Sequence, residues 1–202
     1  MYCAGYLPIS ARTRQTNAVR TREPSREWAH TRYYGEQFND ELRRLVVNYF
    51  RSHAASAIAP TTSTLFKSLR GIPGYAASTW SERHAAFAAG LGTFGLCDGF
   101  LTPVGKAMRC GNVVTNAPIS VTPRRFTSHV EACPYLTSGF CGACMLRCPA
   151  GAIGPDGHDK EKCERYQEET LRPLRQKYGV SITGCGLCQT GVPCEAGLPV
   201  QD

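Results

Sequence analysis

Cysteine content constrains this chain more than any other sequence feature. The sequence contains 11 cysteines, and eight of them lie between Cys133 and Cys194. An odd total, repeated CxxC spacings and an N-terminus without a signal-like apolar stretch argue against a disulfide framework. In a reducing compartment, clustered thiols are typical of metal ligands. The sequence therefore predicts a metal-binding protein, which we expect to be cytoplasmic.

The spacing of these cysteines indicates which metal they bind. The stretch FCGACMLRCPAGAI (140–153) contains C-x2-C-x3-C-P, most of the bacterial ferredoxin pattern C-x2-C-x2-C-x3-C-P. Eight thiolates is the number that two [4Fe–4S] clusters require, and in this pattern the cysteine before proline serves the cluster of the other motif. That rule predicts a first cysteine set of Cys133, Cys141, Cys144 and Cys194, and a second cysteine set of Cys148, Cys163, Cys185 and Cys188.

Two ligands are displaced from their expected positions, which leaves alternatives open. Ser138 stands where the first cysteine of the ferredoxin pattern would fall, and Val192 stands before Pro193. We expect Cys133 and Cys194 to replace them. The alternatives are a single cluster with one degenerate site, or a zinc ribbon. The zinc ribbon would use Cys141, Cys144, Cys185 and Cys188. The remaining cysteines fit no spacing and are expected to be structural thiols: Cys3, Cys97 and Cys110.

Composition and patterning predict a globular α/β protein with three parts. The chain has 202 residues, of which 42% are hydrophobic and 19% charged, and no apolar run is long enough to span a membrane. We expect an arginine-rich arm (1–24), an α/β domain (25–126) and a loop-rich ferredoxin-like domain (127–202). Residues 1–35 hold six arginines, which indicate either a solvated arm or a docking surface for an acidic redox partner or nucleic acid.

Hydrophobic periodicity predicts the individual elements. Apolar residues at spacings of three and four predict a long amphipathic helix over 25–54. A short strand is expected at 56–60, a short helix at 63–71 and another helix from Thr79. Two strands are expected to form a hairpin around Pro103-Val104-Gly105. Residues 164–179 predict a charged helix that is kinked near Pro173.

The stretch WSERHAAFAAGLGTFGLCDGFLTPVGKAMRCGNVVTNAPI (80–119) resembles the cobalamin-contacting region of epoxyqueuosine reductases and reductive dehalogenases. The resemblance implies a truncated nitroreductase-like half-fold followed by a bacterial ferredoxin-like module with two [4Fe–4S] clusters. It also implies that a cobalamin contacts the turn at Gly90, Gly92 and Gly95, since glycine leaves room for a flat macrocycle.

Two functions follow from this resemblance. The first is an electron-transfer protein that relays electrons between redox partner proteins through two [4Fe–4S] clusters. The alternative is a cobalamin-dependent reductase, an oxidoreductase acting on a small molecule. For that alternative Ala76 occupies the position of the family's catalytic aspartate, so Tyr75 is the candidate acid. We expect His84, His129 and Asp98 to be structural. The segment before residue 75 is shorter than the family's N-terminal half, which supplies much of the corrinoid pocket. The end of the chain, eight residues after Cys194, argues against a tRNA substrate.

Overall fold

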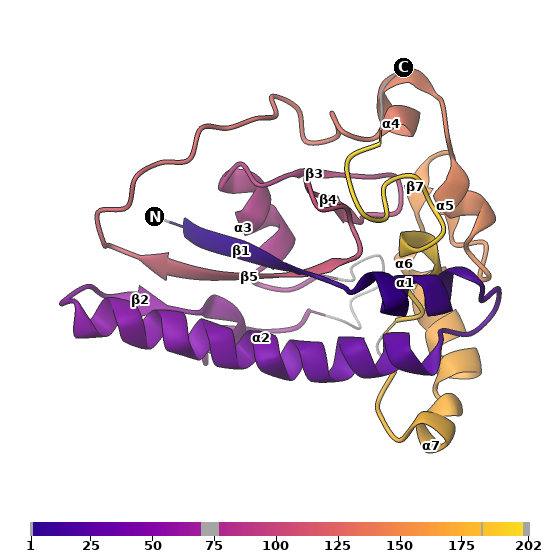
Figure 1. The fold of residues 1–202 in the computed structure, drawn as a ribbon, viewed down its shortest axis with the longest axis horizontal. Helices are drawn as coiled ribbons and strands as arrows, with labels where there is room; N and C mark the ends of the chain where they lie inside the picture. Colours follow the sequence, from indigo (N-terminus) through magenta and orange to yellow (C-terminus); the bar gives the residue numbers. More distant parts are fainter. Residues whose placement is uncertain (1, 70–76, 183, 200–202) are drawn as a thin grey trace.

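The computed structural model describes residues 2–69, 77–182 and 184–199, and has a mixed α/β fold (Figure 1). Its strands are β1 (Tyr2–Pro8), β2 (Ala57–Ile58), β3 (Thr93–Phe94), β4 (Phe100–Leu101), β5 (Met108–Thr115), β6 (Ile153–Gly154) and β7 (Gly157–His158). Its helices are α1 (Ala11–Ala18), α2 (Arg26–Ser52), α3 (Glu82–Ala88), α4 (Pro134–Ser138), α5 (Ala143–Leu146), α6 (Lys160–Tyr166) and α7 (Leu174–Tyr178). Two 3-10 turns, η1 (Pro60–Thr62) and η3 (Leu187–Gln189), and a π-helical segment, η2 (Gln167–Leu171), complete the elements.

A three-stranded antiparallel sheet forms the centre of the α/β part, in the order β1-β5-β2. Side chains of β5 alternate between its two faces, as the pleat of a strand requires. Val113 packs against Val47 of α2, whereas Met108 packs against Ala86 of α3. Figure 1 shows α2 along one side of the sheet and α3 on the other. The sheet is therefore a middle layer with a helix on each face.

The helix predicted over 25–54 is confirmed as α2. Ser25 caps it, because its hydroxyl accepts a hydrogen bond from the Trp28 backbone N–H at 3.0 Å. The predicted short strand is also present, as β2, which pairs with β5. The helix predicted at 63–71 is wrong over the residues described. Ser68 instead bridges Ser78 in an antiparallel pair. That long-range pairing satisfies the backbone groups that a helix would have satisfied locally.

The predicted hairpin is correct in its turn and wrong in its partners. Gly105 N–H donates to the Thr102 carbonyl at 2.8 Å, which closes the turn. The strands on its two sides belong to different sheets, because β5 already pairs with β1 and β2 along both edges. Strand β4 pairs with β3 instead. The turn at 102–105 therefore joins β4, in the two-stranded sheet with β3, to β5 of the central sheet.

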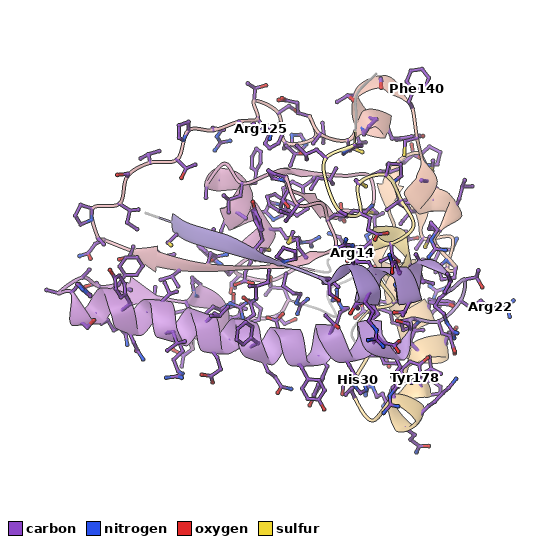
Figure 2. The ribbon with its side chains drawn as sticks, in the orientation of Figure 1. Arg14, Arg22, His30, Arg125, Phe140 and Tyr178 are labelled. Carbon is purple, nitrogen blue, oxygen red and sulfur yellow. The ribbon has the colours of Figure 1, made fainter. Side chains whose placement is uncertain are left out.

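The cysteine-rich half consists of short elements joined by turns, as predicted. The charged helix predicted over 164–179 is present as α6, η2 and α7. The Arg172 N–H bonds the Gln167 carbonyl, five residues back, immediately before Pro173. Leu171 is fully buried and packs with Tyr178 and with Ala29 of α2. In Figure 2, His30 and Tyr178 lie beside each other, and the His30 ring nitrogen is 2.7 Å from the Tyr178 carbonyl.

The N-terminal residues do not form the expected arm. Residues 2–8 pair with β5 in continuous antiparallel register, and α1 follows with Ser10 as its cap. The edge of β5 offers unpaired backbone groups, and the first segment of the chain satisfies them. The expectation of a solvated arm is therefore wrong for the part of 1–24 that the structure describes.

The helix α1 also ties the N-terminus to the cysteine-rich half. The Asn17 side chain is fully buried and donates to the Cys185 carbonyl at 3.2 Å and to the Thr190 hydroxyl at 3.0 Å. Arg14 forms an ion pair with Glu195 at 2.9 Å, and Figure 2 places Arg14 on α1, next to the C-terminal segment. At least some of the N-terminal positive charge thus has internal partners. Within the described ranges, no helix has the length and apolar character needed to cross a membrane.

A buried arginine joins α2 to α3. The side chain of Arg43 is only 2% exposed and forms ion pairs with Glu36, Asp40 and Glu82. Its Nε donates to the Glu82 carboxylate at 2.8 Å. The adjacent Arg44 is 60% exposed and pairs only with Glu41 on its own helix turn, among the ion pairs of the described residues.

Replacing Arg43 with alanine is expected to lower the free energy of unfolding by about 3–5 kcal/mol, because it leaves the Glu82 carboxylate, only 15% exposed, without its arginine and removes a buried side chain from the packing. The matched change Arg44→Ala should cost less than about 1 kcal/mol, since its exposed ion pair is screened by water. Urea unfolding followed by circular dichroism measures both. Equal losses for the two variants would show that the Arg43 network does not hold α3 to α2.

Candidate metal centre

The four members of the second cysteine set line one cavity of about 670 Å³. Cys148 follows α5 and precedes Pro149, and Cys163 belongs to α6. Cys185 and Cys188 lie on either side of Gly186, whose positive φ of 62° starts the turn of η3. This left-handed turn directs the two cysteines of a CxxC pair toward the same cavity.

The four members of the first cysteine set line a second, smaller cavity. Cys133 is the residue before α4, Cys144 belongs to α5, and Cys194 comes from the C-terminal segment. Cys141 has a φ of +91°, which is rare for a residue with a side chain and is a feature of functional loops. The adjacent Gly142 is also left-handed, so the loop between α4 and α5 turns back sharply at this point.

The structure thus brings each predicted cysteine set together, and none of the described cysteines lines both cavities. Ser138, at the expected ferredoxin position, instead donates its hydroxyl to the Pro134 carbonyl at 2.8 Å. The zinc-ribbon alternative would need Cys141 and Cys144 from one cavity with Cys185 and Cys188 from the other. Among the described residues, no three or more cysteine, histidine or acidic side chains are grouped closely enough to hold a single ion. A cubane spreads its ligands around four irons, so its thiols stand farther apart than those around one ion.

Hydrogen-bond donors already face the sulfurs of the second set. The Ala152 N–H donates to Cys148 Sγ at 3.3 Å, and Gln167 donates to Cys163 Sγ at 3.4 Å. The pKa of His158 is raised to about 10, first by the Asp98 carboxylate, which lies 3.5 Å from its Nδ1, and then by Cys163. Donors of this kind stabilise negative charge on sulfur.

Burial has the opposite effect on several thiols. It raises the pKa of Cys185 and of Cys194 above the ordinary value for cysteine. These thiols are therefore protonated near neutral pH in the metal-free protein, and a metal that binds them must displace their protons.

Cys97 is a ninth thiol at this centre, which the spacing argument missed. It is 5% exposed and lies in a buried cluster against which Cys144 and Cys188, one from each set, are packed. These two cysteines lower its pKa, against the effect of burial. Lys106, also missed, is 3% exposed and places its Nζ 3.3 Å from Cys97 Sγ. Cys97 lies in the turn between β3 and β4, and Lys106 lies between β4 and β5. No spacing rule connects these turns to the cysteine motifs.

The glycines of the 89–95 turn pack against the protein itself. A Cβ on Gly92 would lie 2.1 Å from the Leu101 carbonyl oxygen, and one on Gly95 would lie 2.7 Å from a Leu101 methyl group. Gly90 has a positive φ of 80° and lies close to Arg124. Close packing on β4 explains the need for glycine at 92 and 95, and the positive φ explains it at 90. The cobalamin contact remains a prediction.

The other candidate residues have structural surroundings or lie outside the described residues. Tyr75 and Ala76 belong to the latter group. His84 lies 2.7 Å from the hydroxyl of Ser81, the N-cap of α3. Asp98 has a φ of +57° in the turn before β4, and its carboxylate is 3.4 Å from Lys160 Nζ. The His129 backbone carbonyl accepts a hydrogen bond from Phe94 N–H at 2.6 Å.

Comparison with known proteins identifies relatives of one kind. The chain is 32% identical over 124 residues to an epoxyqueuosine reductase from Bacillus cereus, which covers 58% of this chain and 30% of that protein. It is 32% identical over 126 residues to an epoxyqueuosine reductase from Francisella cf. novicida. The chain thus spans about a third of the length of these curated relatives. No family model matches the sequence.

Solved structures share the fold. A selenomethionine-labelled epoxyqueuosine reductase matches with a TM-score of 0.57 and 20% identity, covering 99% of this chain and 50% of the other. A second epoxyqueuosine reductase, solved with a tRNA-Tyr epoxyqueuosine-modified tRNA stem loop, matches with a TM-score of 0.54 and the same coverage.

These matches correct one sequence argument and establish what the chain resembles. The argument against tRNA as a partner is wrong, because a structure of this fold holds a tRNA stem loop. The position at which a chain ends does not reveal which of its surfaces contacts an RNA. The chain is a relative of the epoxyqueuosine reductases, similar to them in sequence over 58% of its length and in fold over 99%.

Proposed function

We propose that this chain is an iron–sulfur electron-transfer protein with two [4Fe–4S] clusters, one in each cysteine-lined cavity. The separation of the eight candidate ligands between two cavities supports the proposal: four line the larger cavity, beside Cys97 and Cys110, and four line the smaller one. Each group supplies the four thiolates that one cluster needs, and the grouping is the one expected from the ferredoxin rule. In this proposal the α/β part is a nitroreductase-like half-fold and residues 127–202 are the ferredoxin-like module.

The donor set of each cavity suits such a cluster. Thiolates are the ligands of [4Fe–4S] clusters, and N–H groups directed at cluster sulfur are one of the means by which proteins adjust the potential. Here the Ala152 N–H and the Gln167 amide supply such donors to the second set. When bound, the clusters would store and release single electrons. The chain's own residues hold the thiolates, donate hydrogen bonds to sulfur and exclude water from most of the centre.

The exposure of Cys141 indicates where electrons would enter or leave. Cys141 is exposed, and the flanking Phe140 and Leu146 are 75% and 90% exposed. Phe140 points away from the body of the protein in Figure 2. The smaller cavity, which the first cysteine set lines, is therefore close to solvent on this side, where a redox partner protein can approach.

Reversible reduction tests the electron-transfer function. Anaerobically purified protein, treated with dithionite, should lose visible absorbance and give an electron paramagnetic resonance signal of about two spins per chain, one for each cluster. Adding oxidised cytochrome c should restore the starting absorbance. A protein that takes up no electrons, or that cannot return them, would contradict the proposal.

A second candidate function is a reductase, favoured by the identity with epoxyqueuosine reductases. The cavity that holds the second set also extends past the cysteines to Phe66, Trp80 and Cys110, which leaves room for a ligand. The substrate class suggested by the relatives is epoxyqueuosine-modified tRNA. A dithionite-reduced sample should then convert this nucleoside in a tRNA stem loop, which nucleoside mass spectrometry would detect. Cobalt analysis after incubation with cobalamin tests the predicted corrinoid in the same sample.

A further inference from the structure

Lys106 lies between the two cavities. Among the residues that the structure describes, it alone lines both of them. Its backbone N–H donates to the Cys194 carbonyl at 2.9 Å. The preceding Gly105 is left-handed, and a Cβ there would lie 2.2 Å from the Glu195 carbonyl oxygen. The backbone around Lys106 is therefore packed directly on the segment that carries Cys194, and this packing fixes the position from which its side chain extends.

The surroundings of the Lys106 ammonium group are thiols. Its Nζ lies 3.3 Å from Cys97 Sγ, and no carboxylate of the described residues forms an ion pair with it. Burial lowers the pKa of Lys106, but its charge interactions with sulfur raise the pKa above the ordinary value. The interacting thiols come from both sets and from Cys97, in the order Cys97, Cys194, Cys188 and Cys144.

A buried ammonium group without a carboxylate partner is unfavourable unless other negative charge compensates it. Four cysteine thiolates around a [4Fe–4S] core give the whole site a net negative charge, and each one-electron reduction adds another. A cation at this distance stabilises the reduced state more than the oxidised state, and low dielectric around it strengthens the effect. Lys106 thus places positive charge where clusters in the two cavities would accumulate negative charge.

We propose that Lys106 is a fixed positive charge shared by the two cluster sites, and that it raises the reduction potential of both. This inference rests on the proposed function, because it requires a cluster in each cavity. Lys106 acts on the clusters through space and is not one of their ligands.

The test compares variants of the full chain, purified without oxygen and analysed for iron and sulfide before any potential is measured. Lys106→Met removes the charge and keeps a long side chain, Lys106→Gln removes the charge and keeps a donor, and Lys106→Arg keeps the charge. Lys177→Met is the matched control, because Lys177 is exposed and pairs with Glu23 on a different part of the surface. A redox titration followed by electron paramagnetic resonance gives the potentials.

The proposal predicts that Lys106→Met and Lys106→Gln keep their iron and have lower potentials for both clusters. At a fixed applied potential, the ratio of reduced to oxidised cluster should fall at least tenfold, which is about 59 mV for a one-electron couple. Lys106→Arg and Lys177→Met should shift the ratio less than threefold. Unchanged potentials in the neutral variants, or a shift of one cluster only, would overturn the proposal.

Cluster loss in the variants is also informative. Loss of iron from both neutral variants, with full iron in Lys106→Arg, would overturn the proposal, because the charge would then be needed to hold the clusters and not to set their potentials. Loss of iron from all three Lys106 variants would show that Lys106 is needed for packing, and this would overturn the proposal. Iron-free wild-type protein would contradict the proposed function itself, and this inference with it. If the wild type holds its full iron and the neutral variants have unchanged reduction potentials, only the inference about Lys106 is contradicted, and the proposed function stands.

Discussion

Replacing Cys148 with alanine is expected to remove the cluster held by Cys163, Cys185 and Cys188 and to leave the other intact. Cys148 belongs to the same CxxC run as Cys141 and Cys144, yet it lines the other cavity. Iron content should therefore fall from about eight to about four per chain, as loss of one four-iron cubane requires. Because the remaining cluster is the one near the exposed Cys141, it should still accept electrons.

The matched variant Cys133→Ala should have the opposite pattern. Cys133 is the substitute for the cysteine that Ser138 replaces, and it lines the cavity of the first set. Its loss should remove about four irons and spare the cluster of the second set. A double variant should retain neither cluster. Cys97→Ser is the control: both sets are complete without Cys97, so the variant should keep about eight irons.

Spectra distinguish these outcomes. Each single variant should have half the absorbance of the wild type, and the two residual clusters should have different electron paramagnetic resonance spectra. Identical residual spectra for Cys148→Ala and Cys133→Ala would contradict the crossed assignment, since both changes would then affect the same cluster. Loss of iron in Cys97→Ser would make Cys97 a ligand and displace a member of one set.

Replacing Gly186 with alanine should destabilise the fold by about 2–5 kcal/mol, the sum expected for overpacking and for a left-handed residue with a side chain. Gly186 has a φ of +62°, and a Cβ there would lie 2.0 Å from the fully buried indole of Trp28. Neither the ring nor the turn can give way easily, because Cys185 and Cys188 flank the glycine. We expect the change to disturb the second cysteine set along with the packing of α2.

Urea unfolding of the iron-free protein measures the loss of stability, and iron content measures the loss of the cluster. Gly154→Ala is the matched control, because a Cβ there would meet no atom within 4 Å. It should change the free energy of unfolding by less than about 0.5 kcal/mol. Equal stability of Gly186→Ala and wild type would show that α2 and the 185–188 turn can separate without cost.

Local patterns in the sequence predicted those features that depend on neighbouring residues. The helix α2 followed from periodic apolar residues, which act within one element. The break before Pro173 followed from the missing N–H of proline. The two cysteine sets were assigned by a spacing rule that reflects how a short loop wraps a cluster, and that assignment stays a prediction. The structure places each predicted set in a single cavity, and ligation itself remains to be measured.

Features that depend on distant contacts were not predictable in this way. The strand β1 pairs with β5, at the far end of the α/β part, so residues 2–8 looked like an arm. The predicted helix at 63–71 failed because Ser68 pairs with Ser78. Lys106 meets the cysteine motifs where the 194–196 segment packs onto the turn after β4, and Cys97 meets them through its packing near Cys144 and Cys188. No residue spacing within the chain encodes that packing.

The most direct test is the content of iron, acid-labile sulfide and zinc in wild-type protein purified without oxygen. Two [4Fe–4S] clusters predict about eight irons and eight sulfides per chain with negligible zinc. About four irons and four sulfides per chain would mean that only one cavity holds a cluster. Stoichiometric zinc without sulfide would mean that the cysteines bind zinc and hold no cluster. Either result would contradict the two-cluster account.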